Sequence, residues 1–303
     1  GLFWTCTSLK YRDHFITGSD LIFSIPKRLI ATGWPESFEN LGSSDQKNVM
    51  RTLNMNPGFQ LRYLGDVACR NYISKHYSRD VARVYEKEET GCLRGDLCRA
   101  AVLFKEGGYY ADLDVEFLVP FSEIAPPDMD FLTVRSAVSG LLNAIQFGTA
   151  SHPVLQSSWM EMQDWYKTPS GARKTWMAGT DALELALSQF HSLECPGSNL
   201  EPLTSDEVEC GGHRVRILRE LDCHNVVTGC MGRNTSFDGS KYGIYLGAKQ
   251  VAWSRFLDCT TYGCGGTGHS DRSHFDLIDL KSYNMPTFEP VGANASFGWQ
   301  ADR

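Results

Sequence analysis

The sequence predicts an α/β fold built on a mainly parallel sheet. Short β-type runs alternate with longer amphipathic segments along most of the chain, which is typical of strands joined by crossover helices. The chain has 303 residues, of which 42% are hydrophobic and 21% charged, enough for a substantial core. No internal repeat or low-complexity tract interrupts the alternation, so neither a repeat architecture nor a disordered chain is expected.

The N-terminal part opens the alternation between strands and helices. Its β-type runs are rich in branched and aromatic residues, and its helical segments end at turn-forming residues. We expect a strand over residues 21–32, a helix over 43–58, a second short strand over 59–64, and one or two helices over 67–87.

Residues 95–108 form the clearest predicted helix. Apolar residues recur there at i, i+3, i+4 and i+7, and Gly107-Gly108 ends the pattern. A strand follows at once over residues 107–117. Further along, we expect a strand over 129–136, helices over 153–166 and 179–191, and one good strand over 213–221.

The strand predicted over residues 107–117 alternates strictly between acidic and apolar side chains. Asp112, Asp114 and Glu116 share one face, with successive members about 6.5 to 7 Å apart. Unscreened carboxylates at that spacing raise one another's pKa, whereas a divalent cation such as Mg²⁺ or Mn²⁺ removes the repulsion. The spacing therefore leaves two interpretations open: a solvated strand face or a cation site.

The preceding helix carries a second polar pair, Asp96 and Arg99. They lie three residues apart on the face opposite the apolar stripe, within reach of each other. One interpretation is a helix N-cap and a surface ion pair of little energetic value. The other is a carboxylate that binds sugar hydroxyls and a guanidinium that binds those hydroxyls or a diphosphate.

Charge and cysteine content indicate the compartment and exclude one class of partner. The net charge of −7 and the lack of a Lys/Arg run argue against nucleic acid. Ten cysteines, six of them after residue 190, and two glycosylation sequons at Asn234 and Asn294 favour a secretory lumen. No stretch is long and apolar enough to span a membrane, and the N-terminus is not a signal peptide. A membrane anchor trimmed from this chain would fit these observations.

Residues 95–121, "GDLCRAAVLFKEGGYYADLDVEFLVPF", resemble the sugar-binding region of glycosyltransferase family 32. That region has Asp-x-x-Arg on a helix, an apolar stretch, Gly-Gly, an aromatic residue and then Asp-x-Asp. The same spacing is similar to that of the large clostridial glucosylating toxins. The residues that fall on the motif are Asp96, Arg99, Gly107, Gly108, Tyr110, Asp112 and Asp114.

Three other segments support the resemblance. Residues 25–34, "IPKRLIATGW", look like the family's opening strand, where Thr32 and Trp34 would lie near the nucleotide base. Residues 143–153 are similar to the segment after Asp-x-Asp and include Asn143. Residues 178–187 resemble a later helix start in the family and include Asp181.

The resemblance implies a GT-A fold, in which a Rossmann-like sheet carries Asp-x-Asp at a strand end. It implies a nucleoside-diphosphate sugar as donor and Mn²⁺ (or Mg²⁺) as cofactor. Asp114 would ligate the metal directly, and Asp112 would reach the metal shell, the ribose or the donor sugar. Asp96 and Arg99 would contact donor sugar hydroxyls, and Tyr110 would line the donor pocket. We expect one catalytic domain over 1–303, with a nucleotide-sugar-binding core over about 20–195 and a Cys-rich part over about 196–303.

Several site candidates keep a plain structural alternative. Asn143 and Asp181 are candidates for the reaction face, although a turn residue and a helix N-cap describe them as well. His269 is a candidate metal ligand from the C-terminal part, as are Ser270 and the segment Trp253-Ser254. A histidine in a glycine-rich loop is more often structural or exposed to solvent.

The function that the resemblance implies is a retaining, metal-dependent hexosyl transfer from a UDP- or GDP-linked sugar to a glycan, lipid or protein. The predicted location is the Golgi lumen, with secretion as the alternative. A secreted carbohydrate- or metal-binding module, or an inactive homologue, is the alternative function. A dehalogenase-type phosphatase fits badly, because its Asp-x-Asp comes near the start of the domain.

Overall fold

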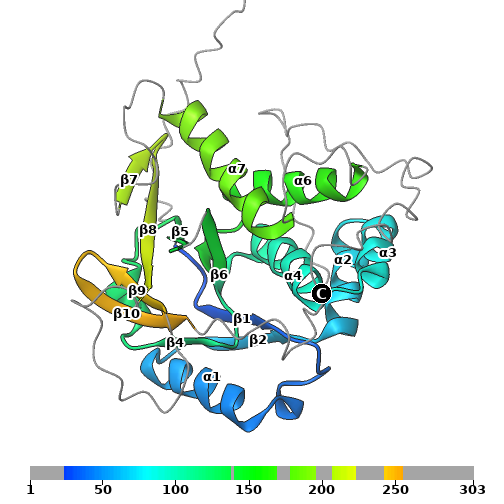
Figure 1. Ribbon diagram of the computed structural model, residues 1–303, viewed down its shortest axis with the longest axis horizontal. Coiled ribbons are helices and arrows are strands. Elements are labelled where there is room, and N and C mark those ends of the chain that lie inside the picture. Colours follow the sequence, from blue (N-terminus) through cyan, green and yellow to red (C-terminus); the bar gives the residue numbers. More distant parts are fainter. Residues whose placement is uncertain (1–23, 138–139, 169–177, 196–206, 223–241, 255–303) are drawn as a thin grey trace, which may run out of the picture.

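The structure is a computed structural model that describes residues 24–137, 140–168, 178–195, 207–222 and 242–254. Helices and strands alternate through most of this part of the chain, so the predicted α/β class is confirmed (Figure 1). The strands are β1 (Arg28–Thr32), β2 (Gln60–Leu64), β3 (Gly108–Ala111), β4 (Val115–Phe117), β5 (Phe131–Arg135), β6 (Leu141–Gly148), β7 (Glu207–Cys210), β8 (His213–Asp222), β9 (Tyr242–Leu246) and β10 (Lys249–Ser254). The helices are the 3-10 turn η1 (Phe38–Asn40), α1 (Ser43–Met55), α2 (Asp66–His76), α3 (Arg79–Lys87), α4 (Gly91–Glu106), α5 (Phe121–Ile124), α6 (Pro153–Lys167) and α7 (Ala178–Glu194).

The strands form a single mixed sheet. Its order is β2-β1-β3-β6-β5-β8-β9-β10-β4, with β7 paired to β8. The strands β2, β1 and β3 are parallel, as expected for a Rossmann-like half, and β5 is parallel to β8. The other pairs are antiparallel, so the sheet as a whole is mixed. The part that matches the expectation of parallel strands is the N-terminal half.

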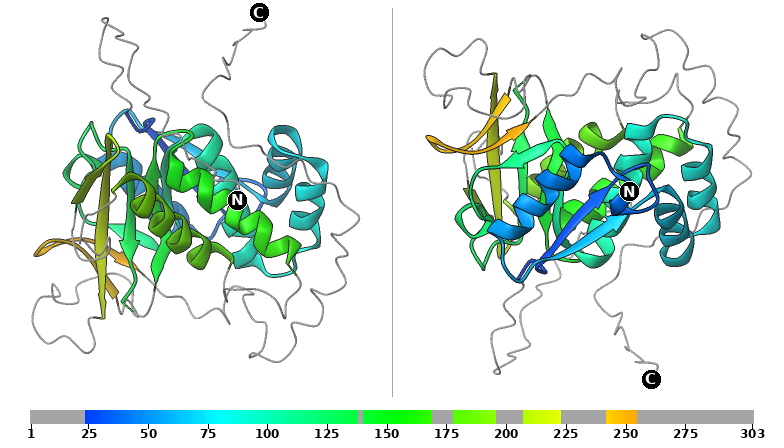
Figure 2. Two further views of the ribbon diagram at one scale, coloured as in Figure 1. Left: turned by 90° about the horizontal axis from the view of Figure 1, so that it is seen from above. Right: turned by 90° about the horizontal axis from the view of Figure 1, so that it is seen from below.

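Two hydrophobic cores lie on opposite faces of the sheet. Side chains alternate between them, because successive residues of a strand point to opposite faces. Ile30 and Tyr110 face the core made with α2, α3, α4, α6 and α7, whereas Leu29 and Tyr109 face the core on the α1 side. Figure 2 shows this layering, with α6 and α7 toward the viewer from above and α1 toward the viewer from below.

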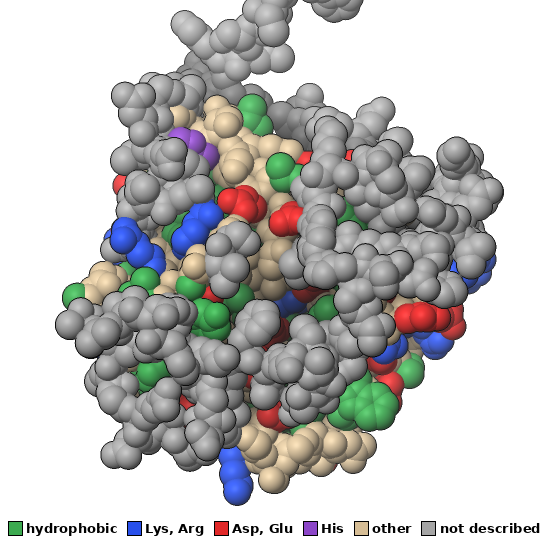
Figure 3. Space-filling model, viewed as in Figure 1, with side chains coloured by type: hydrophobic (Ala, Val, Ile, Leu, Met, Phe, Trp, Pro, Cys, Tyr) green, Lys and Arg blue, Asp and Glu red, His purple; other side chains and the backbone are tan. Residues whose placement is uncertain are grey.

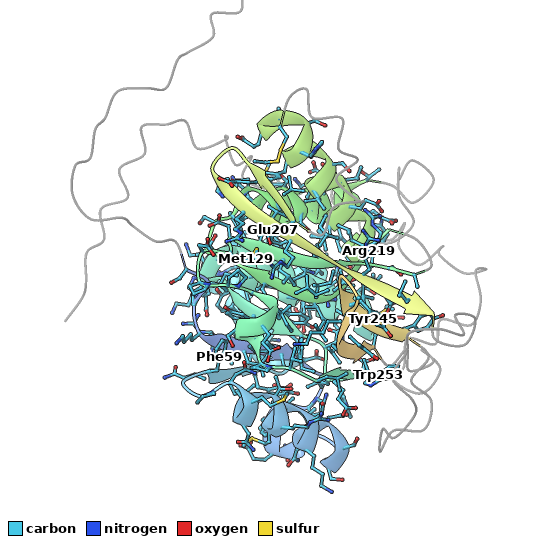
Figure 4. All side chains as sticks on the ribbon, turned by 90° about the vertical axis from the view of Figure 1, so that its left-hand side faces the viewer. Phe59, Met129, Glu207, Arg219, Tyr245 and Trp253 are labelled. Atoms are coloured by element: carbon cyan, nitrogen blue, oxygen red, sulfur yellow. A yellow bond between two sulfur atoms is a disulfide. The ribbon has the colours of Figure 1, made fainter. Side chains whose placement is uncertain are left out.

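The sheet curls so that its far edge returns to the middle of the molecule. Strand β4 stands at the end of the sheet order, beyond β10, yet only three residues separate it from the central strand β3. Because consecutive Cα atoms are 3.8 Å apart, four such steps from Ala111 to Val115 span at most about 15 Å. Figure 4 shows this returning part from the side, with Arg219 on β8, Tyr245 on β9 and Trp253 on β10.

Most of the predicted helices and strands lie where the sequence placed them. The segment over 67–87 is two helices, α2 and α3, and the helices over 153–166 and 179–191 are α6 and α7. Helix α4 begins at Gly91, earlier than expected, and ends as predicted at Gly107, whose φ of 64° favours glycine. A Cβ on Gly107 would also lie 2.6 Å from the backbone nitrogen of Ala150.

In the described part of the chain, one disulfide joins two helices and another joins a helix end to the sheet. Cys69 of α2 is bonded to Cys98 of α4, and Cys195, directly after α7, is bonded to Cys210 of β7. The first bridge is buried and crosslinks the helix that carries Asp96 and Arg99 to its neighbour. No helix within the described ranges has the length and apolar character needed to cross a bilayer.

Candidate active site

The Asp-x-Asp motif lies in a tight turn between β3 and β4. The Val115 amide donates to the Asp112 carbonyl at 3.1 Å, and the Asp112 amide donates to the Ala144 carbonyl of β6 at 2.9 Å. The expectation that Asp112, Asp114 and Glu116 share one strand face is therefore wrong, because the turn breaks the strand after Ala111. The sequence 112–114 sits at the carboxyl end of β3, where ligands bind in open α/β sheets.

Glu116 has a structural role and is separate from the two aspartates. It is buried in β4 and forms an ion pair with Arg51 of α1. Asp112, in contrast, has a side chain that is 35% exposed, and Asp114 is half-buried. The solvated-face interpretation of the three carboxylates therefore fails for Glu116, while the two aspartates of the motif remain accessible.

Asp96 and Arg99 form a buried ion pair on α4. Their side chains are only 6% and 5% exposed, so the interpretation as a helix cap and a surface pair is wrong. Because α4 begins at Gly91, Asp96 lies in its second turn and is not an N-cap. Helix α4 contacts α2, α6, α7 and the sheet, which buries it on nearly all sides.

Arg99 connects α4 to the Asp-x-Asp turn. One guanidinium nitrogen donates to Asp96, and the other donates to Asp112 Oδ1 at 3.0 Å and to the Asn143 carbonyl at 2.6 Å. Its Cζ also lies 4.6 Å from the ring centroid of Tyr110, in cation–π geometry. Arg99 therefore fixes the side chain of Asp112 from the α4 side of the sheet.

Tyr110 and Thr32 complete this contact. The Tyr110 hydroxyl donates to Asp112 Oδ1 at 2.5 Å and lies 3.0 Å from Thr32 Oγ1 at the end of β1. Both Arg99 and Tyr110 use the same oxygen of Asp112, so Oδ2 is left to bind another ligand. The parallel pairing of β1 with β3 brings Thr32 beside Tyr110, because the two strands end at the same edge of the sheet.

The ionisable groups of this cluster are shifted by burial and by one another. Burial raises the pKa of Asp96, against the opposing effect of Arg99. Desolvation disfavours the charged form of Arg99, but Tyr110, Asp112 and Asp96 outweigh it and hold its pKa above the usual value. Burial raises the pKa of Tyr110 well above its ordinary value, so its hydroxyl stays a donor at neutral pH.

Asn143 and the start of α7 close the cluster around Asp96. Asn143 of β6 donates from Nδ2 to Asp96 Oδ1 at 2.7 Å. A Cβ on Gly179 would lie 2.1 Å from Asp96 Oδ2 and 2.5 Å from Asn143 Nδ2, so only glycine fits there. Asp181, two residues later, lies half-buried in the first turn of α7.

Trp34 stands apart from the polar cluster, on a loop that follows β1. Its side chain is 78% exposed. The loop is pinned to the end of β2 and the start of α2: Tyr63 donates to the Pro35 carbonyl at 2.8 Å, and the Glu36 carboxylate accepts from the Val67 amide at 3.2 Å. An aromatic face exposed on an ordered loop can stack on a planar ligand such as a nucleobase.

The residues at the turn fit a hard divalent cation. Asp112 and Asp114 supply carboxylate oxygens, the donors that Mg²⁺ and Mn²⁺ prefer, and Asp112 has one oxygen outside its bonds to Arg99 and Tyr110. Ser254 of β10 pairs with Val115, the residue after Asp114, which brings the predicted segment Trp253-Ser254 to the turn. No group of three His, Cys, Asp or Glu in metal-binding geometry occurs within the described ranges. His269 and Ser270 lie outside the described residues.

The structure brings six predicted residues into one contiguous cluster. They are Thr32, Asp96, Arg99, Tyr110, Asp112 and Asn143. Asp114 adjoins this cluster through the turn, and Trp34 does not contact the cluster through any bond described above.

Sequence reasoning missed two residues, Gly179 and Asn48. The side-chain amide of Asn48 donates to the Leu113 and Val115 carbonyls of the turn. The sequence does carry a signal for Asn48, because Asn48, Thr52 and Asn56 recur at i, i+4 and i+8 and so form a polar stripe along one face of the predicted helix.

Comparison with known proteins finds a match for the region that contains four residues of this cluster, Asp96, Arg99, Tyr110 and Asp112. Residues 42–132 match the family described as a glycosyltransferase sugar-binding region containing a DXD motif. An uncharacterised glycosyltransferase, L373 of Acanthamoeba polyphaga mimivirus, is 18% identical over 206 residues, which are 67% of this chain and 79% of that protein.

Two solved structures are similar over shorter shares of this chain. The PaToxG glycosyltransferase is 18% identical, with 55% of this chain and 70% of that chain covered and a TM-score of 0.42. A structure described as a transferase is 12% identical, with 59% and 88% covered and a TM-score of 0.33.

The class of protein follows from the matched region and the motif within it. Residues 42–132 include Asp96, Arg99, Tyr110, Asp112 and Asp114, so the resemblance predicted from the sequence is confirmed there. Residues 42–132 thus match the sugar-binding region of DXD glycosyltransferases, and as an enzyme the protein is a glycosyltransferase.

Proposed function

We propose that this glycosyltransferase is metal-dependent and retaining, and that it moves a hexose from a UDP- or GDP-linked sugar to a glycan, lipid or protein acceptor. The observation that carries the proposal is the cluster of Asp96, Arg99, Tyr110 and Asp112 at the carboxyl ends of β1 and β3. This cluster lies within the region that matches the DXD glycosyltransferase family. The same edge of the sheet exposes Asp112 and Trp34, so a sugar nucleotide could contact both.

The chain's own residues have distinct tasks in this proposal. Asp112 and Asp114 would hold the cation, which acts as a Lewis acid that stabilises negative charge on the diphosphate. Arg99 and Tyr110 hold Asp112 through Oδ1, so that its orientation is fixed before the donor binds. Trp34 would stack on the base. The prediction that Asp96 and Arg99 contact donor sugar hydroxyls stays a prediction.

The retaining outcome requires that the acceptor attacks the face from which the diphosphate leaves. The anomeric carbon then carries oxocarbenium-like charge, which nearby carboxylates and amide oxygens stabilise. Asp96 and Asn143 provide such oxygens close to the motif. Asp181 stays a candidate at the reaction face, because it follows Gly179, which packs on Asp96.

The proposed location is the Golgi lumen, with a membrane anchor outside this sequence. Two disulfides support an oxidising compartment, and the one between Cys69 and Cys98 is buried beside the proposed donor site. Among the described side chains on the face that Figure 3 shows, acidic and basic groups are mixed and form no extended basic area for a polyanion.

A donor screen tests the proposal. Purified protein is incubated with UDP- and GDP-sugars, with Mn²⁺ or with chelator, and the released nucleoside diphosphate is measured. We expect slow turnover of one donor that requires the metal and is lost in Asp114→Ala. Asp164→Asn, which changes a carboxylate that is 69% exposed on α6, serves as the matched control and should retain full turnover.

Binding measurements decide the case in which no donor is turned over. Some transferases hydrolyse their donor only slowly without an acceptor, so calorimetry with Mn²⁺ and each nucleoside diphosphate follows. Metal-dependent binding that Asp114→Ala abolishes, without turnover of any donor and acceptor, would identify an inactive homologue. Binding of neither metal nor nucleotide would contradict the proposal and favour a carbohydrate-binding module.

A further inference from the structure

Asn48 of α1 is bonded to the backbone of the Asp-x-Asp turn from the side opposite Arg99. Its Nδ2 donates to the Leu113 carbonyl at 2.9 Å and to the Val115 carbonyl at 2.7 Å. These carbonyls belong to the residues on either side of Asp114. Asn48 is 5% exposed, so its amide is shielded from water; its bond to Val115 is buried and its bond to Leu113 is partly buried.

The two aspartates are thus held from two different helices. Asp112 is fixed through its side chain by Arg99 of α4 and by Tyr110 of β3. The backbone around Asp114 is fixed by Asn48 of α1, which packs against β4 on the other face of the sheet. A hydrogen bond within the turn, from the Val115 amide to the Asp112 carbonyl, links the residue held by Arg99 and Tyr110 to the segment held by Asn48.

We propose that Asn48 is a positioning residue for the metal site, acting through the backbone that flanks Asp114. The inference rests on the function proposed above. Groups that orient metal ligands without touching the metal affect its affinity by about 10- to 100-fold when they are removed. Asn48 meets that description, because its amide bonds the carbonyls of the residues before and after a proposed ligand but itself lies on α1.

The same helix provides a matched control, Asn56. It is also 5% exposed, and it lies directly after α1. Its Oδ1 accepts from the Phe121 amide at 2.6 Å and its Nδ2 donates to the Thr52 carbonyl at 2.7 Å. Asn56 therefore anchors the start of α5 and makes none of these bonds to the turn. Both substitutions, Asn48→Ala and Asn56→Ala, remove a buried amide that bonds two backbone groups.

The test compares Mn²⁺ affinity in the two variants. Calorimetry measures the Kd of Mn²⁺ in the presence of a saturating nucleoside diphosphate, and thermal unfolding measures stability. We expect the two variants to lose similar stability, and only Asn48→Ala to bind Mn²⁺ at least about tenfold more weakly. Hydrogen exchange of the peptides that cover residues 111–117 should rise in Asn48→Ala and stay unchanged in Asn56→Ala.

The outcomes separate this inference from the proposed function. If the wild-type chain binds Mn²⁺ with nucleotide and Asn48→Ala binds it equally well, the inference is overturned and the proposed function stands. The inference is also overturned if Asn56→Ala weakens metal binding as much as Asn48→Ala. A wild-type chain that binds no metal overturns both. If Asn48→Ala does not fold, Asn48→Ser, which keeps one donor, replaces it with the same expected direction.

Discussion

Replacing Arg99 with methionine should leave the Asp96 carboxylate buried without its ion-pair partner. Arg99 contacts Asp96, Asp112, the Asn143 carbonyl and the Tyr110 ring, and its side chain is 5% exposed. Methionine is of similar length, so the cavity left behind is small. Removing one partner of a buried ion pair costs about 3–5 kcal/mol, and four lost contacts place this case near the upper end of that range.

Urea unfolding at pH 7 measures the cost. A matched control is Arg83→Met on α3, which breaks an Asp-Arg pair of the same spacing whose arginine is 54% exposed. That control should change the free energy of unfolding by no more than about 0.5 kcal/mol. The contrast reports burial together with the further contacts of Arg99, because sequence spacing and residue types are the same in both pairs.

A double-mutant cycle identifies the cause of the loss. In Asp96→Asn/Arg99→Met no unpaired charge is buried, so the double variant should be more stable than Arg99→Met alone. The deficit of Arg99→Met should also shrink on acidification, since an unpaired Asp96 with a raised pKa binds a proton more readily in the folded state than in the unfolded one. The reasoning is refuted if Arg99→Met costs no more than Arg83→Met, or if the two single costs simply add.

Three further predictions concern single residues. Gly179→Ala should destabilise the fold and displace Asp96, because its Cβ would lie 2.1 Å from Asp96 Oδ2. The control is Gly91→Ala at the start of α4, whose Cβ would meet nothing within 4 Å. Urea unfolding curves measure both variants, and equal stability of the two would contradict the prediction for Gly179. Burial lowers the pKa of His152, the residue that caps the start of α6, from its ordinary value of 6.5 to about 3. The folded chain therefore takes up fewer protons than the unfolded one as the pH falls below 6.5. Stability should therefore fall by about 2 kcal/mol from neutrality to pH 5, and His152→Asn should remove that slope. Trp34→Ala should leave the free energy of unfolding within about 0.5 kcal/mol of wild type, since the side chain is 78% exposed. The same variant should weaken nucleotide binding about tenfold in calorimetry. Unchanged nucleotide binding would exclude stacking of Trp34 on the base.

The elements that could be predicted from sequence carry local signals. Helices α6 and α7 follow apolar periodicity, and α4 ends at Gly107, where the backbone adopts a conformation that favours glycine. The Asp-x-x-Arg and Asp-x-Asp spacing points to the candidate site because the DXD family shares it, and residues 42–132 match the sugar-binding region of that family. Spacing alone could not separate a surface ion pair from a buried one.

The features that sequence reasoning missed depend on contacts between distant residues. Strand β4 pairs with β10, more than a hundred residues later, and this pairing draws residues 115–117 away from β3 and creates the turn. Asp96 and Arg99 are buried because α6, α7 and α2 cover α4, which no pattern within α4 reveals. The contact of Gly179 with Asp96 likewise joins residues more than eighty positions apart.

The charge at the site gives the proposal a test that needs no donor. Asp112 and Asp114 place two accessible carboxylates on one turn, and a bound divalent cation would offset the repulsion between them. Binding of the ion to the folded state alone should raise the free energy of unfolding, by about 2.7 kcal/mol at a concentration 100 times its Kd. Chelator should reverse the shift in urea unfolding, and Asp114→Ala should abolish it. A wild-type chain whose stability is indifferent to Mn²⁺ would show that the turn is not a metal site.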